Sequence, residues 1–139
     1  MTTEHDAIIA LLQENMNEEF RATLQYICHR ISARDRDQVL ADSFKTAALD
    51  EMAHILFFSD MITKLGGTPC FTAWDIDTSH DLAAMLEADI ALEQNAVQRY
   101  TRQLPDLQSA PEVRDLIASV LDDENDHRET FRHYREQLT

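Results

Sequence analysis

The chain has 139 residues, 44% of them hydrophobic and 27% charged, which is typical of one globular domain. Two glycines and three prolines supply too few turn residues for a sandwich or barrel of many short strands, so the composition predicts an all-α protein. The 26 acidic and 12 basic residues give a net charge of −14, which argues against binding to nucleic acid or to an anionic membrane surface.

The sequence carries no signal for export or membrane insertion. No basic segment followed by an apolar one opens the chain, and the longest strongly apolar stretch, Ile55 to Phe58, is too short to span a bilayer. We therefore expect a soluble, cytoplasmic protein. Cys28 and Cys70 form neither a CxxC motif nor a secreted disulfide framework, so both are expected to be reduced and used mainly for packing.

The first half of the chain predicts two antiparallel helices. Apolar residues recur at spacings of three and four, which predicts a helix over residues 3–34 with Thr3 as its cap. After a polar corner, the same period predicts a second helix over residues 35–65, capped by Asp35. The second helix should end at Gly66-Gly67, a typical left-handed cap, and the short connection between the two helices makes them antiparallel.

The second half predicts a long connection followed by another helix pair. Between Gly67 and Thr78 the sequence has no period, and its roughly 12 residues could extend along most of a helix pair. Thr78 or Ser79 can cap a third helix over residues 79–104, which Pro105 ends.

A fourth helix is predicted over residues 109–138. Ser109-Ala-Pro-Glu112 reads as its capping box, with proline in the first turn. The expected fold is therefore an all-α four-helix bundle with one long crossover between the second and third helices.

Each predicted helix carries ionisable side chains on its apolar face, where an unpaired carboxylate costs several kcal/mol. Counted from the expected caps, the first such glutamate follows after 16, 16, 15 and 15 residues, about 24 Å along each axis. Because helix midpoints coincide whichever way neighbouring helices run, we expect these side chains to meet at one level. The six residues are Glu19, Glu51, His54, Glu93, Glu124 and His127.

The chain also repeats itself weakly around these residues. The motif E-x-x-A-x-x-x-Y begins at Glu19 and again at Glu93, and the motif D-E-x-x-H begins at Asp50 and again at Asp123. The first two helices therefore resemble the last two, related by a pseudo-twofold axis through the cluster.

Four carboxylates and two neutral imidazoles can enclose two divalent cations, because the charge of the ions offsets the repulsion between the carboxylates. This ligand set is a general feature of di-iron and di-manganese carboxylate proteins built on four-helix bundles. A single ExxH motif is common by chance, but two of them with two mid-helix glutamates at matched depth are specific. The alternative is that the glutamates are solvated and the histidines are satisfied within the core.

Four further residues have a predicted place beside the cluster. Asp50 and Asp123 can accept the second ring N–H of the histidine on the opposite pair, and the alternative is that they are surface aspartates. Tyr26 and Tyr100 are within reach of a carboxylate oxygen or can act as nearby electron donors, and the alternative is that they are core tyrosines.

At these residues the sequence resembles the bacterioferritins, within the ferritin-like superfamily, from about Leu12 to Phe131. The similarity lies in the segments Asn17 to Tyr26, Asp50 to His54, Asp89 to Glu93 and Asp122 to His127. Register with Gln25-Tyr26 favours Glu19 over the neighbouring Glu18. The resemblance implies two iron ions per subunit at a ferroxidase centre whose ligands are Glu19, Glu51, His54, Glu93, Glu124 and His127, with Tyr26 as a further catalytic residue.

The same resemblance implies an activity and an assembly. Bacterioferritins oxidise Fe(II) with O2 or H2O2 and store Fe(III) mineral inside a protein shell. They usually continue into a short fifth helix, whereas this chain ends at Gln137-Leu138-Thr139. The sequence is thus similar to the shortened mini-bacterioferritins, so we expect a twelve-subunit homo-oligomer, with twenty-four subunits as the alternative.

Met52 is a second match to the family. It follows Glu51 by one residue and therefore points about 100° away from the metal face. With Leu49 and Leu56 it forms a second apolar stripe, which a monomer would expose and a symmetric dimer would cover. In bacterioferritins a methionine here ligates haem iron from both subunits, so the resemblance implies that Met52 binds a shared haem. The alternative is that Met52 only packs at the interface.

Three other functions compete with iron storage. A rubrerythrin-like di-iron peroxidase or oxidase without mineral storage would use the same centre, although the chain has no CxxC pair for a rubredoxin domain. A structural helical assembly without metal would leave the mid-core carboxylates unexplained. Protection of DNA, as in Dps-like proteins, is disfavoured by the charge of −14.

Overall fold

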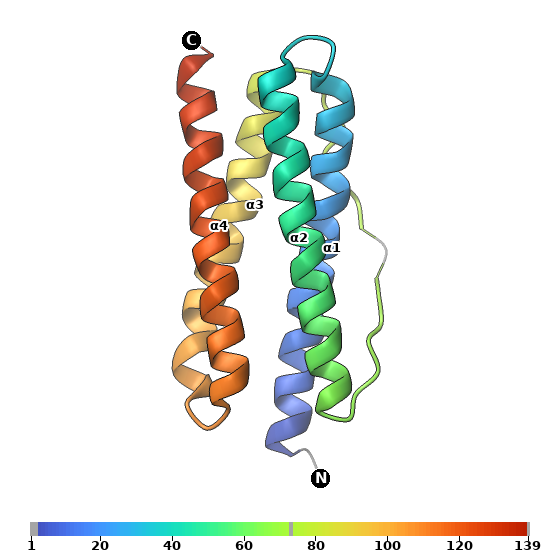
Figure 1. Cartoon of the computed structure of the whole chain (residues 1–139), viewed down its shortest axis with the longest axis vertical. Helices are drawn as coiled ribbons and strands as arrows, with labels where there is room; N and C mark the ends of the chain where they lie inside the picture. Colours follow the sequence, from blue (N-terminus) through green and yellow to red (C-terminus); the bar gives the residue numbers. More distant parts are fainter. Residues whose placement is uncertain (1–2, 73, 139) are drawn as a thin grey trace.

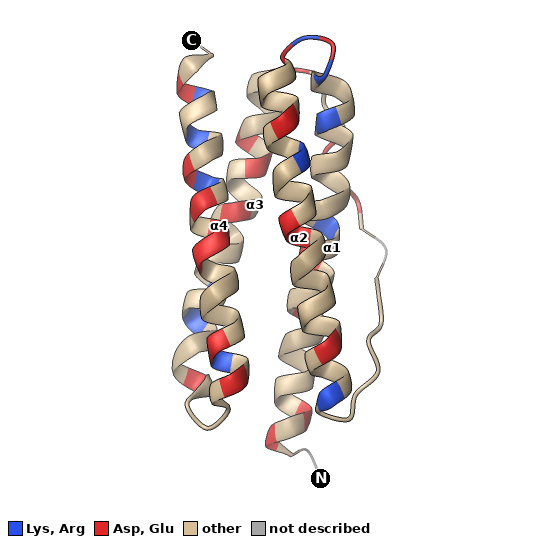
Figure 2. Ribbon diagram, viewed as in Figure 1, with Lys and Arg blue, Asp and Glu red and all other residues tan. Residues whose placement is uncertain are grey.

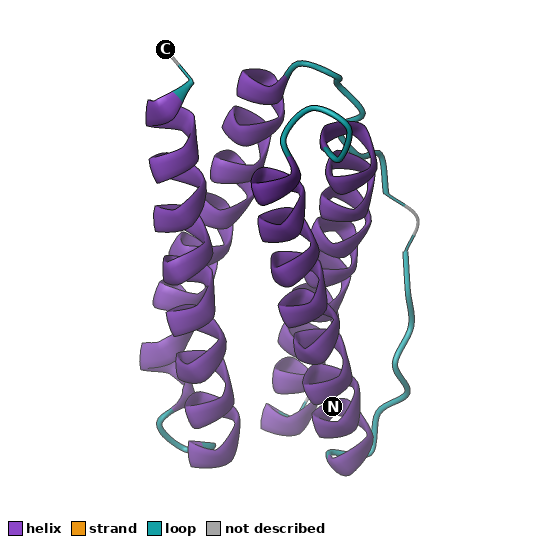
Figure 3. Cartoon of the chain, turned by 45° about the horizontal axis from the view of Figure 1, so that its top comes forward, coloured by secondary structure: helices purple, strands orange, loops and turns teal. Residues whose placement is uncertain are grey.

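The computed structural model describes residues 3–72 and 74–138, and within these ranges it contains helices and no strands (Figure 3). The all-α prediction is confirmed. The expected domain, residues 1–139, also includes residues 1–2, 73 and 139, which lie outside the described ranges. The elements are α1 (Glu4–Ala33), α2 (Gln38–Lys64), α3 (Leu82–Gln103), the short 3-10 helix η1 (Leu104–Leu107) and α4 (Pro111–Gln137).

The four long helices form a bundle of two antiparallel hairpins, α1–α2 and α3–α4 (Figure 1). The segment between α2 and α3 runs along the length of the bundle, so that α2 and α3 point in the same direction. This arrangement confirms the ferritin-like topology with one long crossover. None of the described helices is both long and apolar enough to cross a membrane.

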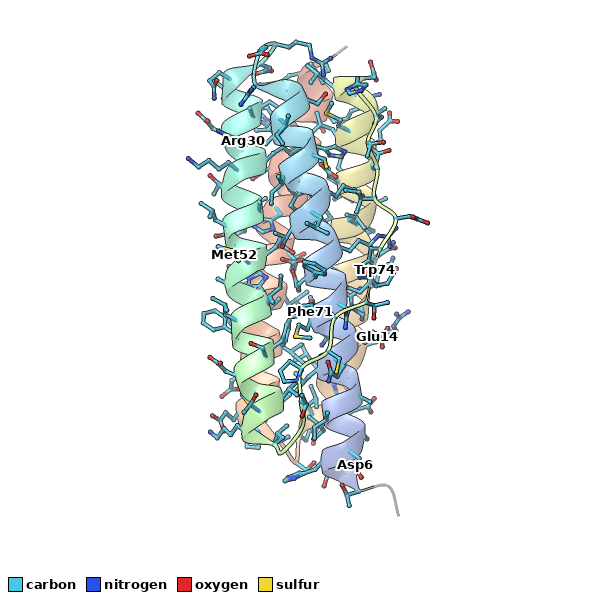
Figure 4. The ribbon with its side chains drawn as sticks, turned by 90° about the vertical axis from the view of Figure 1, so that its right-hand side faces the viewer. Asp6, Glu14, Arg30, Met52, Phe71 and Trp74 are labelled. Carbon is cyan, nitrogen blue, oxygen red and sulfur yellow. The ribbon has the colours of Figure 1, made fainter. Side chains whose placement is uncertain are left out.

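The crossover is held against α1 by side-chain amides. The backbone N–H of Cys70 donates to Gln13 Oε1 at 3.1 Å, and that of Thr72 donates to Asn17 Oδ1 at 2.6 Å. Phe71 also packs against α1, as Figure 4 shows. The path of the crossover is therefore fixed by α1, which satisfies backbone donors that have no helix or sheet of their own. Cys28 and Cys70 are free cysteines, as expected.

The predicted caps are right at α1 and at the end of α2. The Thr3 hydroxyl accepts from the Asp6 backbone N–H at 3.0 Å, and the Asp6 carboxylate accepts from the Thr3 N–H at 3.1 Å. At the other site Gly66 has φ +93°, a left-handed conformation that favours glycine. The N–H groups of Gly66 and Gly67 then bond to the carbonyl oxygens of Thr63 and Ile62, which makes a Schellman cap.

The predicted N-terminal caps of α2 and α3 were wrong, because in each case a neighbouring aspartate caps the helix. Helix α2 is capped by Asp37 in place of Asp35, and its carboxylate accepts from the Leu40 N–H at 3.0 Å. Helix α3 is capped by Asp81, whose carboxylate accepts from the Ala84 N–H at 2.9 Å. Neither Thr78 nor Ser79 takes this place.

The capping box predicted at Ser109 was also wrong. Ala110 precedes α4 and provides no side-chain cap, while the Ser109 hydroxyl donates to Glu4 at the start of α1. Pro111 in the first turn removes one of the donors that a cap would have to satisfy. Pro105 lies in η1, which directly extends α3.

The apolar core is divided into two clusters by a polar layer. One cluster lies between the start of α1 and the end of α2 and includes Leu12 and Phe58, and the other lies at the opposite end and includes Phe44 and Phe131. On every long helix the change from one cluster to the other occurs at a buried glutamate. The middles of the four long helices therefore meet in one polar layer inside the bundle.

Candidate metal centre

The six predicted ligands all lie in the polar layer. The four glutamates stand near the middle of their helices, although the corrected caps place Glu51, Glu93 and Glu124 fewer residues from their helix starts than expected. None of the six is more than 8% exposed. Acidic residues lie at a similar height on α2, α3 and α4 in Figure 2. Sequence spacing alone thus located the layer.

The ligand atoms form two overlapping groups, in each of which every atom lies within 4.8 Å of the others. The first group, which we call position 1, consists of Glu19, Glu51, His54 and Glu124. The second, position 2, consists of Glu51, Glu93, Glu124 and His127. Glu51 and Glu124 belong to both groups, so their carboxylates can bridge two cations.

Both histidines present Nδ1 to the carboxylates. His54 Nδ1 lies 3.4 Å from a Glu19 oxygen and 3.5 Å from a Glu124 oxygen. His127 Nδ1 lies 3.0 Å from a Glu51 oxygen and 3.3 Å from a Glu93 oxygen. Each imidazole therefore faces one of the two positions.

The expected aspartate contacts are confirmed. His54 Nε2 lies 2.7 Å from Asp123, and His127 Nε2 lies 2.9 Å from Asp50. Each contact joins α2 to α4, so the aspartate that precedes one ligand glutamate holds the histidine of the other helix. A carboxylate that accepts Nε2–H leaves the Nδ1 lone pair free for a metal ion.

Both tyrosines reach a ligand carboxylate, and they do so across the bundle. The Tyr26 hydroxyl on α1 donates to Glu93 Oε1 on α3, and the Tyr100 hydroxyl on α3 donates to Glu19 Oε1 on α1 at 2.5 Å. This crossed pairing was not predicted. Glu18, by contrast, is half-buried outside both ligand groups and lies 3.9 Å from Arg21.

Seven buried ligand atoms have no hydrogen-bond partner among the residues that the structure describes. They are Glu19 Oε2, Glu51 Oε1 and Oε2, Glu93 Oε2, Glu124 Oε1, and Nδ1 of His54 and His127. Buried polar atoms are normally paired, so a set of this size in one layer is typical of a site that binds a ligand. Hard oxygen donors with two imidazole nitrogens suit divalent first-row cations. The residues present therefore fit a pair of such ions.

Without metal the cluster favours protonated groups. Burial, reinforced by the neighbouring carboxylates, raises the pKa of Glu51 and of Glu124 well above the usual range. Burial acts to lower the pKa of His127, but the Glu93 carboxylate 3.3 Å from Nδ1 outweighs it, with help from the charge of Glu124, and brings that pKa to about 10. The pKa of His54 is raised in the same way by Glu19 against the effect of burial.

Comparison with known proteins identifies the family of the chain. A family model described as the ferritin-like domain matches residues 9–139. The chain belongs to the ferritin-like family. No curated protein sequence matches it.

Among solved structures, the ferritin-like chain is similar in fold to several bacterioferritins. Mycobacterium tuberculosis bacterioferritin BfrA has a TM-score of 0.89 and 22% identity, over 99% of this chain and 89% of that one. Desulfovibrio desulfuricans bacterioferritin has a TM-score of 0.90 and 23% identity, over 96% and 81%. The dodecameric thioferritin of Bacteroides fragilis, a bacterioferritin-related protein, has a TM-score of 0.89 and 19% identity, over 99% and 89%. At these identities the likeness establishes the fold.

Met52 lies away from the metal centre of this ferritin-like bundle. It is 48% exposed on the outer side of α2, between Leu49 and Leu56, which are also exposed (Figure 4). Ile27 and Ile31 on α1 are exposed large apolar residues as well. The predicted second stripe is therefore present on the surface of the single chain.

Two polar networks, one partly buried and one with a fully buried centre, were not predicted from the sequence. In the first, the Arg99 network, Asn15 and Gln103 exchange amide hydrogen bonds of 2.8 Å, and Arg99 Nε donates to Asn15 at 3.3 Å. The signal that could have revealed it is position in the repeat, because Asn15 stands one helical turn before Glu19.

The second network, the Asp89 network, occupies the equivalent place before Glu93. Gln25 donates to Asp89 at 2.8 Å, and His29 lies between Asp89 at 2.6 Å and Asp77 of the crossover at 2.8 Å. His29 and Asp89 are fully buried. The network fastens the end of the crossover to α1 and α3.

The raised pKa values predict proton release on metal binding. The metal-free cluster holds a proton at pH 7 on His127, whose pKa is about 10, and the pKa values of Glu51 and Glu124 are also raised, so cations that bind there must displace protons. Calorimetric titration of the metal-free protein with Co(II), without oxygen and in buffers of different ionisation enthalpy, should therefore show proton release and an affinity that rises with pH. A binding heat independent of buffer would contradict the prediction.

The same shifts set the sign of the stability profile without metal. Because the folded-state pKa of His127 is about 10, above its ordinary 6.5, its contribution is fully present below pH 6.5 and is lost as the pH rises toward 10. The free energy of unfolding of the metal-free chain should fall over that range, and His127→Gln should flatten the fall.

Proposed function

We propose that the chain is a ferroxidase of bacterioferritin type, which binds two Fe(II) ions as substrate and oxidises them to Fe(III) with O2 or H2O2. The observation that carries the proposal is the set of seven unpartnered ligand atoms in two groups that share Glu51 and Glu124. The solved Desulfovibrio desulfuricans bacterioferritin, which has this fold, contains a diiron site.

The chain's own residues prepare the centre for this reaction. Glu51 and Glu124 supply shared anionic oxygens, and a more negative site favours Fe(III) over Fe(II). Tyr26 donates to Oε1 of Glu93 and Tyr100 to Oε1 of Glu19, so that the unpartnered Oε2 atom of each glutamate would be left to hold a metal ion. Tyr26 is also the tyrosine that we propose as a nearby electron donor.

Storage is the second part of the proposal. We propose a homo-oligomeric cytoplasmic shell, with twelve subunits favoured, that retains the Fe(III) produced. The fold-related thioferritin of Bacteroides fragilis is dodecameric, and the exposed stripe on α2 offers an apolar contact between copies. A rubrerythrin-like peroxidase would use the same centre and differ in retaining no mineral.

Substitution of single ligands should stop the reaction. Glu51→Gln, which removes a ligand from both positions, or His127→Gln, which removes one from position 2, should reduce rapid Fe(II) oxidation by about a hundredfold because iron is no longer held at both positions. Stopped-flow absorption after mixing with Fe(II) and oxygen measures the rate, and circular dichroism checks the helical content. Glu14→Gln is the matched control, since Glu14 is exposed on α1 and is outside both groups. Unchanged kinetics in both ligand variants would refute the assignment.

The oligomer can be tested by sedimentation. At micromolar concentration the chain should sediment as one closed species larger than a dimer, and Leu56→Glu should dissociate it because a charge would enter the apolar contact. The control is Asp60→Glu, an acidic residue that is already exposed on the same helix. A monomeric wild-type chain would remove the storage role and leave the peroxidase alternative.

Met52 is the residue that we propose to bind haem between two subunits. Its thioether is a soft, neutral ligand, and the apolar surface around it suits the face of a macrocycle. Met52→Leu conserves volume and should assemble normally, at a cost below about 1.5 kcal/mol, while losing the one haem per two subunits. Absorption spectra after reconstitution with haem measure occupancy. Full occupancy with an unaltered spectrum would mean that Met52 only packs.

A further inference from the structure

The Arg99 and Asp89 networks occupy equivalent places in the two halves of the repeat but carry different charges. Asn15 in one half corresponds to Asp89 in the other, because each lies one turn before its glutamate. Arg99 likewise corresponds to Gln25, since each precedes its tyrosine. The pseudo-twofold symmetry of the ligands is therefore not shared by the charges behind them.

The Arg99 network places a cation behind position 1. The guanidinium of Arg99 lies 4.8 Å from the centre of the Tyr100 ring, and the hydroxyl of that ring donates to Glu19. Arg99 also lines the narrow cavity that reaches the ligand carboxylates, together with Glu18. With Glu18 counted, the charge behind position 1 sums to zero.

The Asp89 network places net negative charge behind position 2. Asp89 is fully buried, and burial raises its pKa to about 6, so it is ionised at pH 7.5. Asp77 adds a second carboxylate, and His29 between them can supply no more than one positive charge. The sum is −1 or lower, at least one charge more negative than behind position 1.

We infer that the two metal positions are unequal: position 2, with Glu93 and His127, holds a divalent cation more tightly than position 1, with Glu19 and His54. Arg99 and Asp89 touch neither ion and act through the electrostatic potential at the carboxylates. The inference rests on the proposed function, because it assumes that both positions bind metal. It assigns the first iron to position 2 and the exchangeable iron to position 1.

The test measures each position alone, because two adjacent cations repel one another and would bind in two steps even at equal positions. Metal-free full-length protein is titrated with Co(II) at pH 7.5 without oxygen, followed by visible absorption and calorimetry. His54→Gln leaves position 2 to be measured, and His127→Gln leaves position 1. We expect the remaining site in His54→Gln to bind Co(II) at least roughly tenfold more tightly than that in His127→Gln, because a difference of one charge acts on a divalent cation from within the bundle, where screening by water is weak.

Two further substitutions replace a charged residue in one half of the repeat by the uncharged residue at the equivalent place in the other half. Arg99→Gln in the His127→Gln background should tighten position 1, and Asp89→Asn in the His54→Gln background should weaken position 2, each by roughly tenfold. Arg135→Gln at a half-buried residue and Asp60→Asn at an exposed one make the same charge changes outside both networks and should alter neither affinity. Circular dichroism confirms folding, and Arg99→Gln still tests the inference if Asp89→Asn fails to fold.

The outcomes separate this inference from the function it rests on. Equal affinities in the two histidine variants, or an effect of Arg99→Gln no larger than that of Arg135→Gln, would overturn the inequality and leave the metal centre intact. Co(II) binding that neither histidine variant alters would overturn the centre itself.

Discussion

Four carboxylates buried together in one layer are the constraint on which the rest of the structure depends. Glu19, Glu51, Glu93 and Glu124 would repel one another in a medium from which water is largely excluded. The two apolar clusters above and below the layer provide the packing that holds these groups in place. Without cations the layer can reduce its charge only by keeping protons, and with two cations the same carboxylates become ligands.

The side chains of the centre also form hydrogen bonds between the two hairpins. Each aspartate–histidine contact joins α2 to α4, and each tyrosine–glutamate contact joins α1 to α3. Residues of one half thus orient the ligands of the other. Loss of these inter-hairpin hydrogen bonds would therefore affect both metal positions. The charges of the Arg99 and Asp89 networks, in contrast, can change the metal affinity of each position separately.

The sequence predicted the parts of the structure that depend on helical period. The faces of the helices, the long crossover and the six clustered side chains all follow from which residues share a stripe, and a period survives small errors in helix ends. The caps at Asp37 and Asp81 were missed because several neighbouring side chains can cap a helix with similar energy. The crossed tyrosine contacts and the His29–Asp89 pair were missed because they join residues that are 60 or more apart in the sequence, and no local pattern specifies such contacts.

The central claim is that divalent cations compensate the buried layer, and equilibrium unfolding with and without metal tests it most directly. Metal bound only to the folded chain stabilises it by mass action. The free energy of unfolding at pH 7.5 without oxygen should rise as Co(II) is added, with saturation of the folded protein at two ions per subunit, and Glu51→Gln should remove most of the gain. A free energy of unfolding that is unchanged by Co(II), or a gain that Glu51→Gln leaves intact, would contradict the account.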